Sequence, residues 1–175
     1  MSCPLRSQGS AESPFSRGST IGNLDAAEAR LFLQRVRRHV GHDGKVIIGA
    51  DMKKDLKTVL AAYDDAAGVT ALFNRDLLKR LNRKLGGDFR PGLFEHSARW
   101  NETESAIEMH LVSSIAQTVT VAGHSFTFDR GETIHTESSR KCDVSTFTEL
   151  FNDNGWAVDH VWTDRHHLFS VFGLS

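Results

Sequence analysis

The sequence is short of cysteine, of proline and of long apolar runs. Its 175 residues include 2 cysteines and 3 prolines. Cys3 and Cys142 form no Cys-x-x-Cys pair, which excludes a disulfide framework, gives no reason to expect a zinc site and predicts a reducing, cytoplasmic setting. No apolar stretch approaches the roughly 18 residues that span a bilayer, so no membrane partner is expected. The first 16 residues also lack the basic and apolar regions of a secretory signal.

An excess of either charge is also missing. The chain has 21 Lys and Arg against 22 Asp and Glu, for a formal net charge of −1. The densest basic run, residues 79–84, has helical spacing and no interleaved aromatic residues, which favours a solvated helix face over a nucleic-acid surface. The 9 histidines show no His-Glu-x-x-His spacing, so we expect them to be solvated and predict no metal site.

What is present is the composition of a globular domain, with 39% hydrophobic and 25% charged residues. We interpret residues 1–17 as a disordered lead-in. An Asp-x-x-Glu capping box at residues 25–28 begins a pattern of helical apolar spacing that ends before Gly41. The β-branched run at residues 45–51 then predicts a buried strand, and this loop, helix and strand are typical of an α/β sheet.

The middle of the chain has a different character. It favours helix from residue 56 to 85 with a break at 64–68, and a second helical patch at 93–100. Alternating segments follow at 106–111, 116–121 and 125–128, with a hairpin turn at 122–124. The last third predicts a helix at 144–151 and an antiparallel pair of strands at 156–162 and 168–174.

Six separated sequence blocks carry a family resemblance. They are GSTIGN (18–23), the strand end Gly-Ala-Asp with Lys54-Asp55, AYDDAAGVTALFNRDLL (62–78), IEMHL (107–111), GETIHTESS (131–139) and WTD (162–164). With these blocks in order, the chain resembles the S-adenosylmethionine-dependent L-histidine Nα-methyltransferases of ergothioneine biosynthesis. The family reaction moves three methyl groups from S-adenosylmethionine to the histidine amine, giving hercynine.

The resemblance implies an α/β fold, a truncated class I (Rossmann-like) methyltransferase sheet with an inserted α+β substrate-binding domain. Residues 18–59 and 138–175 would belong to the sheet, and residues 60–137 to the insertion. A glycine-rich turn after a first strand and an acid ending a second strand, which a class I cofactor site needs, are not found in the sequence. Residues 13–17 are too short and polar to supply the strand that precedes GSTIGN in full-length relatives.

The resemblance also assigns substrate-binding roles. Gly18 and Asn23 would hold the amino-acid end of histidine with Thr20 nearby, next to a helix start whose N–H groups suit a carboxylate. The phenol of Tyr63 would donate to that carboxylate.

At the imidazole end, Glu137 would accept a ring N–H, Met109 would give an apolar contact, Ser139 would lie beside Glu137, and Phe73 would wall the pocket. From the residues alone, other interpretations stay open: a helix-capping turn at 18–23, core positions for Tyr63, Phe73 and Met109, and a surface acid at Glu137. No residue is assigned as a general base.

The expectation is therefore a C-terminal half that keeps much of a histidine pocket, lacks a site for its co-substrate, and is inactive alone. L-histidine is the expected small-molecule partner. The retained sheet would expose an edge and an apolar face that invite association. The alternatives are a non-catalytic histidine or imidazole-binding module and an inert remnant.

Overall fold

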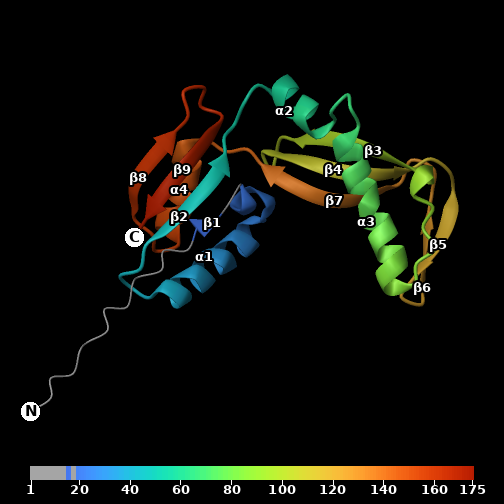
Figure 1. Ribbon diagram of the computed structural model, residues 1–175, viewed down its shortest axis with the longest axis horizontal. Helices are drawn as coiled ribbons and strands as arrows, with labels where there is room; N and C mark the ends of the chain where they lie inside the picture. Colours follow the sequence, from blue (N-terminus) through green and yellow to red (C-terminus); the bar gives the residue numbers. More distant parts are fainter. Residues whose placement is uncertain (1–14, 17–18) are drawn as a thin grey trace, which may run out of the picture. The chain divides into compact units, whose positions relative to one another are not determined.

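The computed structural model describes Phe15, Ser16 and residues 19–175, with side chains from Ser19 onward. The chain divides into two compact units (Figure 1). Unit 1 combines Met1–Met52 with Cys142–Ser175, and unit 2 is Lys53–Lys141. These limits differ from the expected ones at 59 and 137. Helix α2 (Leu56–Tyr63) packs on strands of unit 2, and β7 (Thr133–Arg140) runs unbroken through the sheet of unit 2.

Unit 1 is built on a four-stranded sheet in the order β1-β2-β9-β8. The strands are β1 (Phe15–Ser16), β2 (Val46–Asp51), β8 (Val158–Thr163) and β9 (Phe169–Leu174). β1 is parallel to β2, whereas β9 is antiparallel to both β2 and β8. The predicted α/β sheet and its final antiparallel pair are confirmed.

Two residues of the expected lead-in form part of that sheet. Phe15 and Ser16 pair with Ile47 and Ile48 of β2. The expectation that residues 13–17 supply no strand was wrong at this point, because pairing along a strand edge uses backbone N–H and C=O groups that every such residue carries. The rest of the lead-in lies outside the described residues.

The first long helix of unit 1 begins and ends where the sequence predicts. α1 (Ala26–Val40) starts at the capping box: Asp25 accepts from the backbone N–H groups of Ala27 and Glu28, both at 2.8 Å, and the Glu28 carboxylate accepts from the backbone N–H of Asp25 at 3.0 Å. Gly41 ends it with φ +81°, a conformation that favours glycine. α4 (Val144–Asp153) follows the return from unit 2.

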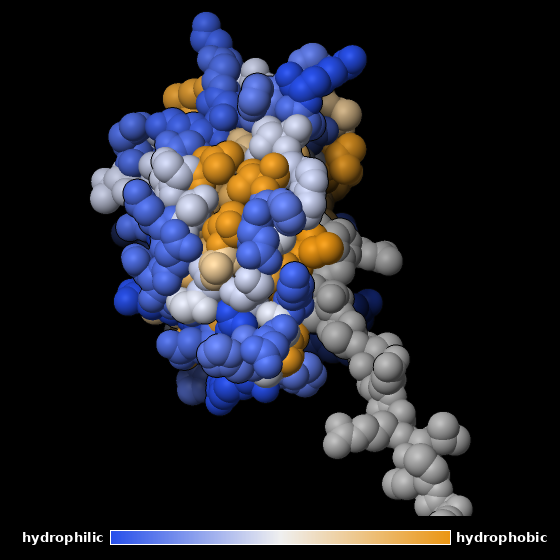
Figure 2. Space-filling view, turned by 90° about the vertical axis from the view of Figure 1, so that its left-hand side faces the viewer, coloured by the Kyte–Doolittle hydropathy of each residue, from blue (hydrophilic) through white to orange (hydrophobic). Residues whose placement is uncertain are grey.

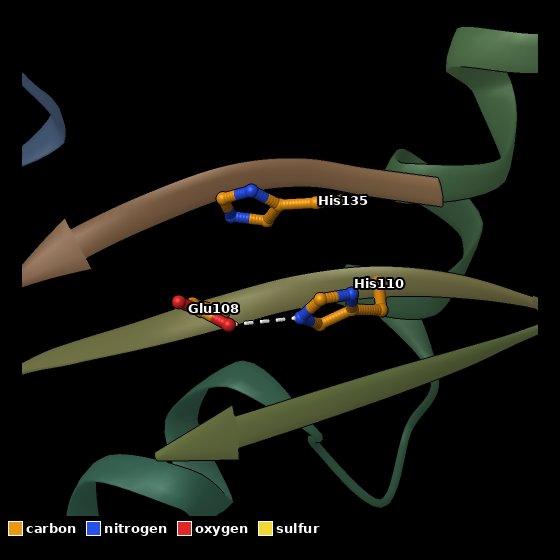
Figure 3. A group of neighbouring side chains, drawn as sticks. All are labelled: Glu108, His110 and His135. Carbon is orange, nitrogen blue, oxygen red and sulfur yellow. Dashed lines mark hydrogen bonds and ion pairs between the residues drawn. The ribbon is translucent and has the colours of Figure 1, made fainter. Parts of the chain in front are cut away.

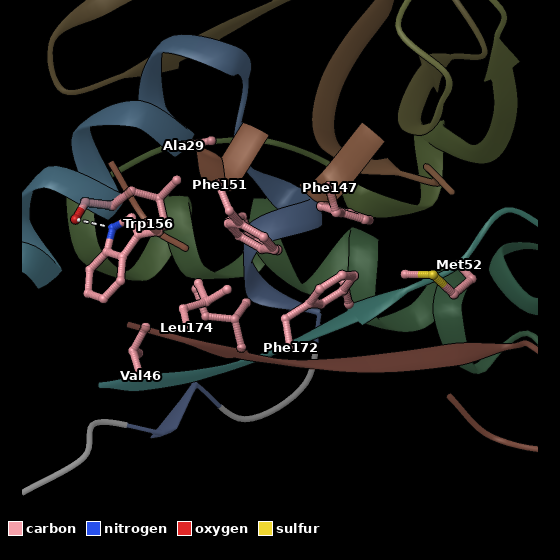
Figure 4. Packing of buried hydrophobic residues seen from close by; sticks show 12 residues of the cluster. Ala29, Val46, Met52, Phe147, Phe151, Trp156, Phe172 and Leu174 are labelled. Carbon is pink, nitrogen blue, oxygen red and sulfur yellow. Dashed lines mark hydrogen bonds between the residues drawn. The ribbon is translucent and has the colours of Figure 1, made fainter. Parts of the chain in front are cut away.

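The core of unit 1 lies between one face of the sheet and the two helices α1 and α4 (Figure 4). Phe147 and Phe151 of α4 meet Phe172 of β9, with ring centroids 5.8 and 5.1 Å away. Trp156 is buried, and its indole N–H donates to the backbone carbonyl of Leu33 in α1 at 3.3 Å.

The opposite face of this sheet carries no helix of unit 1 among the described residues. Ile47 and Val171 are half-buried there, and Trp162 is 53% exposed while its ring covers Gly173. Figure 2, which shows the side of the molecule where β8 lies in Figure 1, has a patch of apolar surface ringed by hydrophilic residues. Trp162 on this face and Leu168 in the turn after β8 are exposed large apolar residues, whereas the exposed Val161 pairs with Phe172 and lies on the core side.

Unit 2 packs helices against a three-stranded antiparallel sheet in the order β3-β4-β7. Its elements are α2, α3 (Val69–Leu85), the short η2 (Pro91–Leu93), β3 (Phe94–Asn101), β4 (Ala106–Ser113), the hairpin β5 (Gln117–Val121) and β6 (His124–Phe128), and β7. A second core, formed by Leu78, Phe89, Phe94, Leu111 and Val119, joins α3 to the sheet and the hairpin.

One predicted helix is a strand. Leu93 ends η2, and the rest of the patch at 93–100 belongs to β3, which pairs with β4 along all 8 of its residues. This pairing and the burial of Phe94 outweigh the weak helical preference of the residues themselves. The hairpin turn at 122–124 is confirmed: Ala122 and Gly123 have φ +52° and +78°, both positive as a type I′ turn requires. No helix in the described part of the chain is long and apolar enough to cross a membrane.

Candidate functional site

The sheet of unit 2 brings three predicted site residues onto one face. β4 and β7 pair Met109 with Glu137 and Ile107 with Ser139. Residues that pair directly, and residues two apart along a strand, point to the same side of a sheet. Met109, Glu137 and Ser139 therefore share a face, which we call the inner face because α2 reaches it through Tyr63.

Tyr63, the last residue of α2, joins this group directly. Its hydroxyl donates to Ser139 Oγ at 2.9 Å. A residue that sequence reasoning missed, Lys141, is 1% exposed and donates from Nζ to the Tyr63 hydroxyl oxygen at 2.9 Å and to Ser139 Oγ at 2.6 Å. Its ammonium group also lies 4.9 Å from the centre of the Tyr63 ring. These contacts fix the direction of the phenol.

Asn74 and His96 together link the two helices of unit 2 to its sheet. Asn74 of α3 is 3% exposed, and its Nδ2 lies 3.0 Å from His96 Nδ1 and donates to the His110 carbonyl at 3.3 Å. The other ring nitrogen of His96 lies 2.8 Å from the Tyr63 carbonyl. If that nitrogen carries the proton, both contacts are satisfied at once. The end of α2 and the middle of α3 are thereby tied to β3.

Phe73 and Glu137 line the same pocket, of about 310 Å³. The pocket is formed between α3 and β7 by Phe73, Asn74, Asp76, Leu77, Arg80, Thr136 and Glu137. Phe73 is 68% exposed, so the interpretation of this residue as core is wrong. The volume is near the lower end of small-molecule sites.

Thr20 and Asn23 lie in unit 1, on the short η1 (Thr20–Asn23), and are exposed. Ser19, just before η1, accepts a hydrogen bond through Oγ from the Asp51 backbone N–H at 2.9 Å. This bond holds η1 at the carboxyl ends of the parallel strands β1 and β2, where α/β sheets commonly bind ligands. Asp25, not Asn23, caps α1, so the helix-capping interpretation does not account for Asn23. Gly18 lies outside the described residues.

The described residues of unit 1 do not by themselves fit S-adenosylmethionine, the co-substrate that the resemblance implies. The first backbone N–H groups of α1 are already bonded to Asp25. The sequence that follows the parallel strand β1 and leads into η1 lacks the Gly-x-Gly-x-x-Gly spacing. No chemical step through this co-substrate is derived from these residues.

The outer face of the same sheet carries a separate polar group, Glu108, His110 and His135 (Figure 3). Glu108 accepts from the Asn101 amide at 2.7 Å, and its second oxygen lies 3.1 Å from His110 Nε2. The Asn101 bond first, and then the His110 bond, hold the pKa of Glu108 below its usual value. The sequence signal for this group is the spacing of Glu108 and His110, which are two residues apart and so share a face of a strand. The His-Glu-x-x-His motif has ligands spaced for a helix, so a search for it does not find this group.

Comparison with known proteins supports a single family. A family model described as "Histidine-specific methyltransferase, SAM-dependent" matches residues 4–175. The histidine N-alpha-methyltransferase of Mycolicibacterium smegmatis is 41% identical over 160 residues, which cover 90% of this chain and 49% of that protein. The ergothioneine biosynthesis protein 1 of Neurospora crassa is 34% identical over 79 residues, or 42% of this chain and 9% of that protein.

Among solved structures, the CcbJ methyltransferase from Streptomyces caelestis aligns with a TM-score of 0.47 and 10% identity, covering 99% of this chain and 59% of that one. The chain spans about half the length of the curated histidine methyltransferases that it matches. The family match extends over nearly all of the sequence. The chain therefore belongs to the family of histidine-specific, S-adenosylmethionine-dependent methyltransferases.

Proposed function

We propose that this chain supplies the histidine-binding part of an L-histidine Nα-methyltransferase of ergothioneine biosynthesis, whose product is hercynine. The single observation that carries the proposal is the inner face of unit 2. There Tyr63 is held by Ser139 and Lys141, while Glu137 lies two residues before Ser139 on the same side of β7.

The spacing of Glu137 and Ser139 along β7 suits one histidine molecule, although the pocket that Glu137 lines does not include Tyr63, Ser139 or Lys141. Residues two apart along a strand are separated by about 7 Å, which is on the scale of the distance between the carboxylate and the imidazole of histidine. To donate to the substrate carboxylate, the Tyr63 hydroxyl would turn its one proton away from Ser139 Oγ, and the Lys141 ammonium beside it favours such an anion. Glu137 favours the imidazole N–H. Met109, paired with Glu137 across the strands, is 4% exposed, as the core interpretation expects, so its apolar contact with the ring would use its few exposed atoms.

Selectivity for histidine follows from Glu137. An amino acid without a ring N–H leaves the half-buried Glu137 carboxylate without its bond to substrate, and this loss costs binding free energy. Phe73, which lines the pocket of Glu137, would then cover the bound ring.

Catalysis needs a site for the methyl donor, which the described residues of unit 1 do not form. We propose that the chain alone binds histidine and makes no hercynine. The alternative, a binding module with no catalytic role, also binds histidine without the donor. Binding of S-adenosylmethionine by the chain would therefore favour the enzyme, whereas histidine binding alone is the result that both functions share.

The test is calorimetric titration of the purified chain with L-histidine and, separately, with S-adenosylmethionine, together with a mass-spectrometric assay for methylated histidine. We expect a histidine isotherm with one site and no product. Failure to bind histidine would contradict the proposal, and hercynine formation by the chain alone would contradict its inactivity. Titration of the Asn23→Ala variant tests the role that the resemblance gives to Asn23.

A further inference from the structure

Glu108, His110 and His135 gather three metal-binding side chains on the outer face of the sheet of unit 2. Glu108 and His110 are two residues apart on β4, so they share a face, and His135 of β7 pairs with His110 across the strands. One donor atom from each residue lies within 4.8 Å of the other two. Figure 3 shows the two imidazole rings and the carboxylate approaching one another from the two strands.

This group is separate from the candidate histidine site. Met109 and Glu137 belong to the opposite, inner face of the same strands. His135 and Glu137 are two residues apart on β7, but the β-bulge opposite Met109 and His110 puts them on different faces. A ligand on the outer face therefore does not need to enter the pocket that Glu137 lines. Neither the family match nor the candidate site gives these three side chains a role.

We propose that Glu108, His110 and His135 bind one divalent transition-metal ion of the zinc type. Two imidazole nitrogens and one carboxylate oxygen are a ligand set that Zn²⁺ takes with a fourth position left to water. Zn²⁺ holds such atoms at about 2.0 to 2.2 Å. At those bond lengths the donor atoms of a tetrahedral site are about 3.3 Å apart.

The present arrangement needs a small rearrangement to reach that geometry. Glu108 Oε2 and His110 Nε2 are already 3.1 Å apart. The exposed His135 has room to move, and its ring is already stacked on that of His110 with centroids 5.0 Å apart. His135 Nε2, now 3.0 Å from Ser138 Oγ and 3.1 Å from the Glu137 carbonyl, must give up these contacts if it becomes the ligand atom.

The buried histidine limits the affinity. His110 is 8% exposed, and its Nδ1 has no hydrogen-bond partner among the described residues. Histidines in dedicated metal sites usually donate the other ring N–H to a carboxylate, a carbonyl or water. Binding through Nε2 leaves the His110 proton on an unpaired nitrogen, so we expect weaker binding than in a closed structural zinc site.

The proposed ion would link β4 to β7. Because an ion that binds the folded state and not the unfolded state stabilises the fold, its binding should raise the melting temperature. The test uses the full chain, stripped of metal and free of any histidine tag, without added L-histidine. Titration with Zn²⁺ by calorimetry, and with Co²⁺ by visible absorption, is expected to show one ion per chain and a rise in melting temperature.

The informative variant is His135→Ala, because an exposed ligand can be removed with little effect on folding. The matched control is His124→Ala, an exposed histidine in the β5-β6 hairpin. We expect Zn²⁺ binding to weaken at least tenfold in His135→Ala and to be unchanged in His124→Ala. Glu108→Gln should weaken binding as well, whereas Glu95→Gln, at an exposed position of β3, should not.

Equal loss in the two histidine variants, or no stoichiometric binding by the unaltered chain, would overturn the proposal. Circular dichroism of each variant separates loss of the site from loss of folding. Because neither metal titration involves L-histidine or a methyl donor, the outcome is independent of the proposed function.

Discussion

A buried ammonium group organises the candidate site at the level of single residues. Lys141 is 1% exposed and gives hydrogen bonds to Tyr63 and Ser139. A charge taken out of water is costly unless its donors are bonded. These two bonds, and the face of the Tyr63 ring, offset that cost and hold the phenol in one direction.

Replacing Lys141 with methionine should weaken histidine binding by roughly tenfold or more, since hydrogen bonds to charged groups contribute about 1.5–3 kcal/mol and 1.4 kcal/mol is a factor of ten. The measurement is calorimetric titration with L-histidine. Lys84→Met, which removes an exposed ammonium from the last turn of α3, is the matched control and should bind like the unaltered chain. Unchanged affinity in a folded Lys141→Met chain would show that Lys141 only supports the structure.

The residues of this group differ in how well the sequence reveals them. Tyr63 and Ser139 stand in blocks that carry the family resemblance, and the structure bonds them to each other. Lys141 follows Ser139 by two residues, which predicts a shared face, yet an isolated lysine after a strand is usually solvent-exposed. Its burial depends on partners that are distant in sequence, such as Tyr63, and these become neighbours only in the fold.

At the level of elements, the start of α3 depends on one carboxylate. Asp65 accepts from the backbone N–H of Thr70 at 2.8 Å and from that of Val69 at 3.0 Å. The bonds from Thr70, and then that from Val69, lower the pKa of Asp65 from 3.8 to about 2. Because the folded-state pKa is lowered, the stabilisation is present above pH 3.8 and is lost as the pH falls through about 2.

We therefore predict that the amide proton resonances of Val69 and Thr70 titrate together with a midpoint near pH 2, the pKa of Asp65. NMR spectra recorded from pH 5 downward measure this. In the Asp65→Asn variant the transition should disappear, while Asp64→Asn should keep it because both bonds to Asp65 remain. A midpoint near the ordinary value for aspartate would argue against this account of how α3 begins.

The sequence predicted α1 well and β3 poorly, and the reason is physical. α1 is specified by neighbours in the chain: Asp25 and Glu28 cap its start, and Gly41 ends it. β3 is specified by β4, through pairs such as Ala98 with Met109 that no local pattern records. Local reasoning therefore found the helix ends and misassigned a strand whose partner lies further along the chain.

For the whole molecule, each unit has a core of its own. Phe151 and Phe172 belong to the core of unit 1, and Leu78 and Leu111 to that of unit 2. The change along the sequence from an α/β pattern to an α+β pattern predicted such a division. The observed limits of unit 2 lie several residues from the predicted ones, because α2 and the end of β7 join unit 2 through tertiary contacts.

Separate cores predict separate losses of stability. Phe151→Ala removes a fully buried ring and should lower the free energy of unfolding of unit 1 by about 3–5 kcal/mol. Native-state hydrogen exchange should show this loss in β2 and β9, with β4 and β7 little changed. Leu78→Ala is the reciprocal variant and should lower protection in unit 2 by about 2–5 kcal/mol. Equal losses in both units after either substitution would show that the two cores unfold together.

The proposed function depends most on recognition of the histidine imidazole by Glu137. Its most direct test is the affinity of the Glu137→Gln chain for L-histidine, measured by calorimetry against the unaltered chain and against Glu149→Gln, an exposed acid on α4. We predict roughly tenfold to hundredfold weaker binding for Glu137→Gln, from the loss of a charged hydrogen bond, and no change for Glu149→Gln. Equal affinities in all three folded proteins would contradict the account.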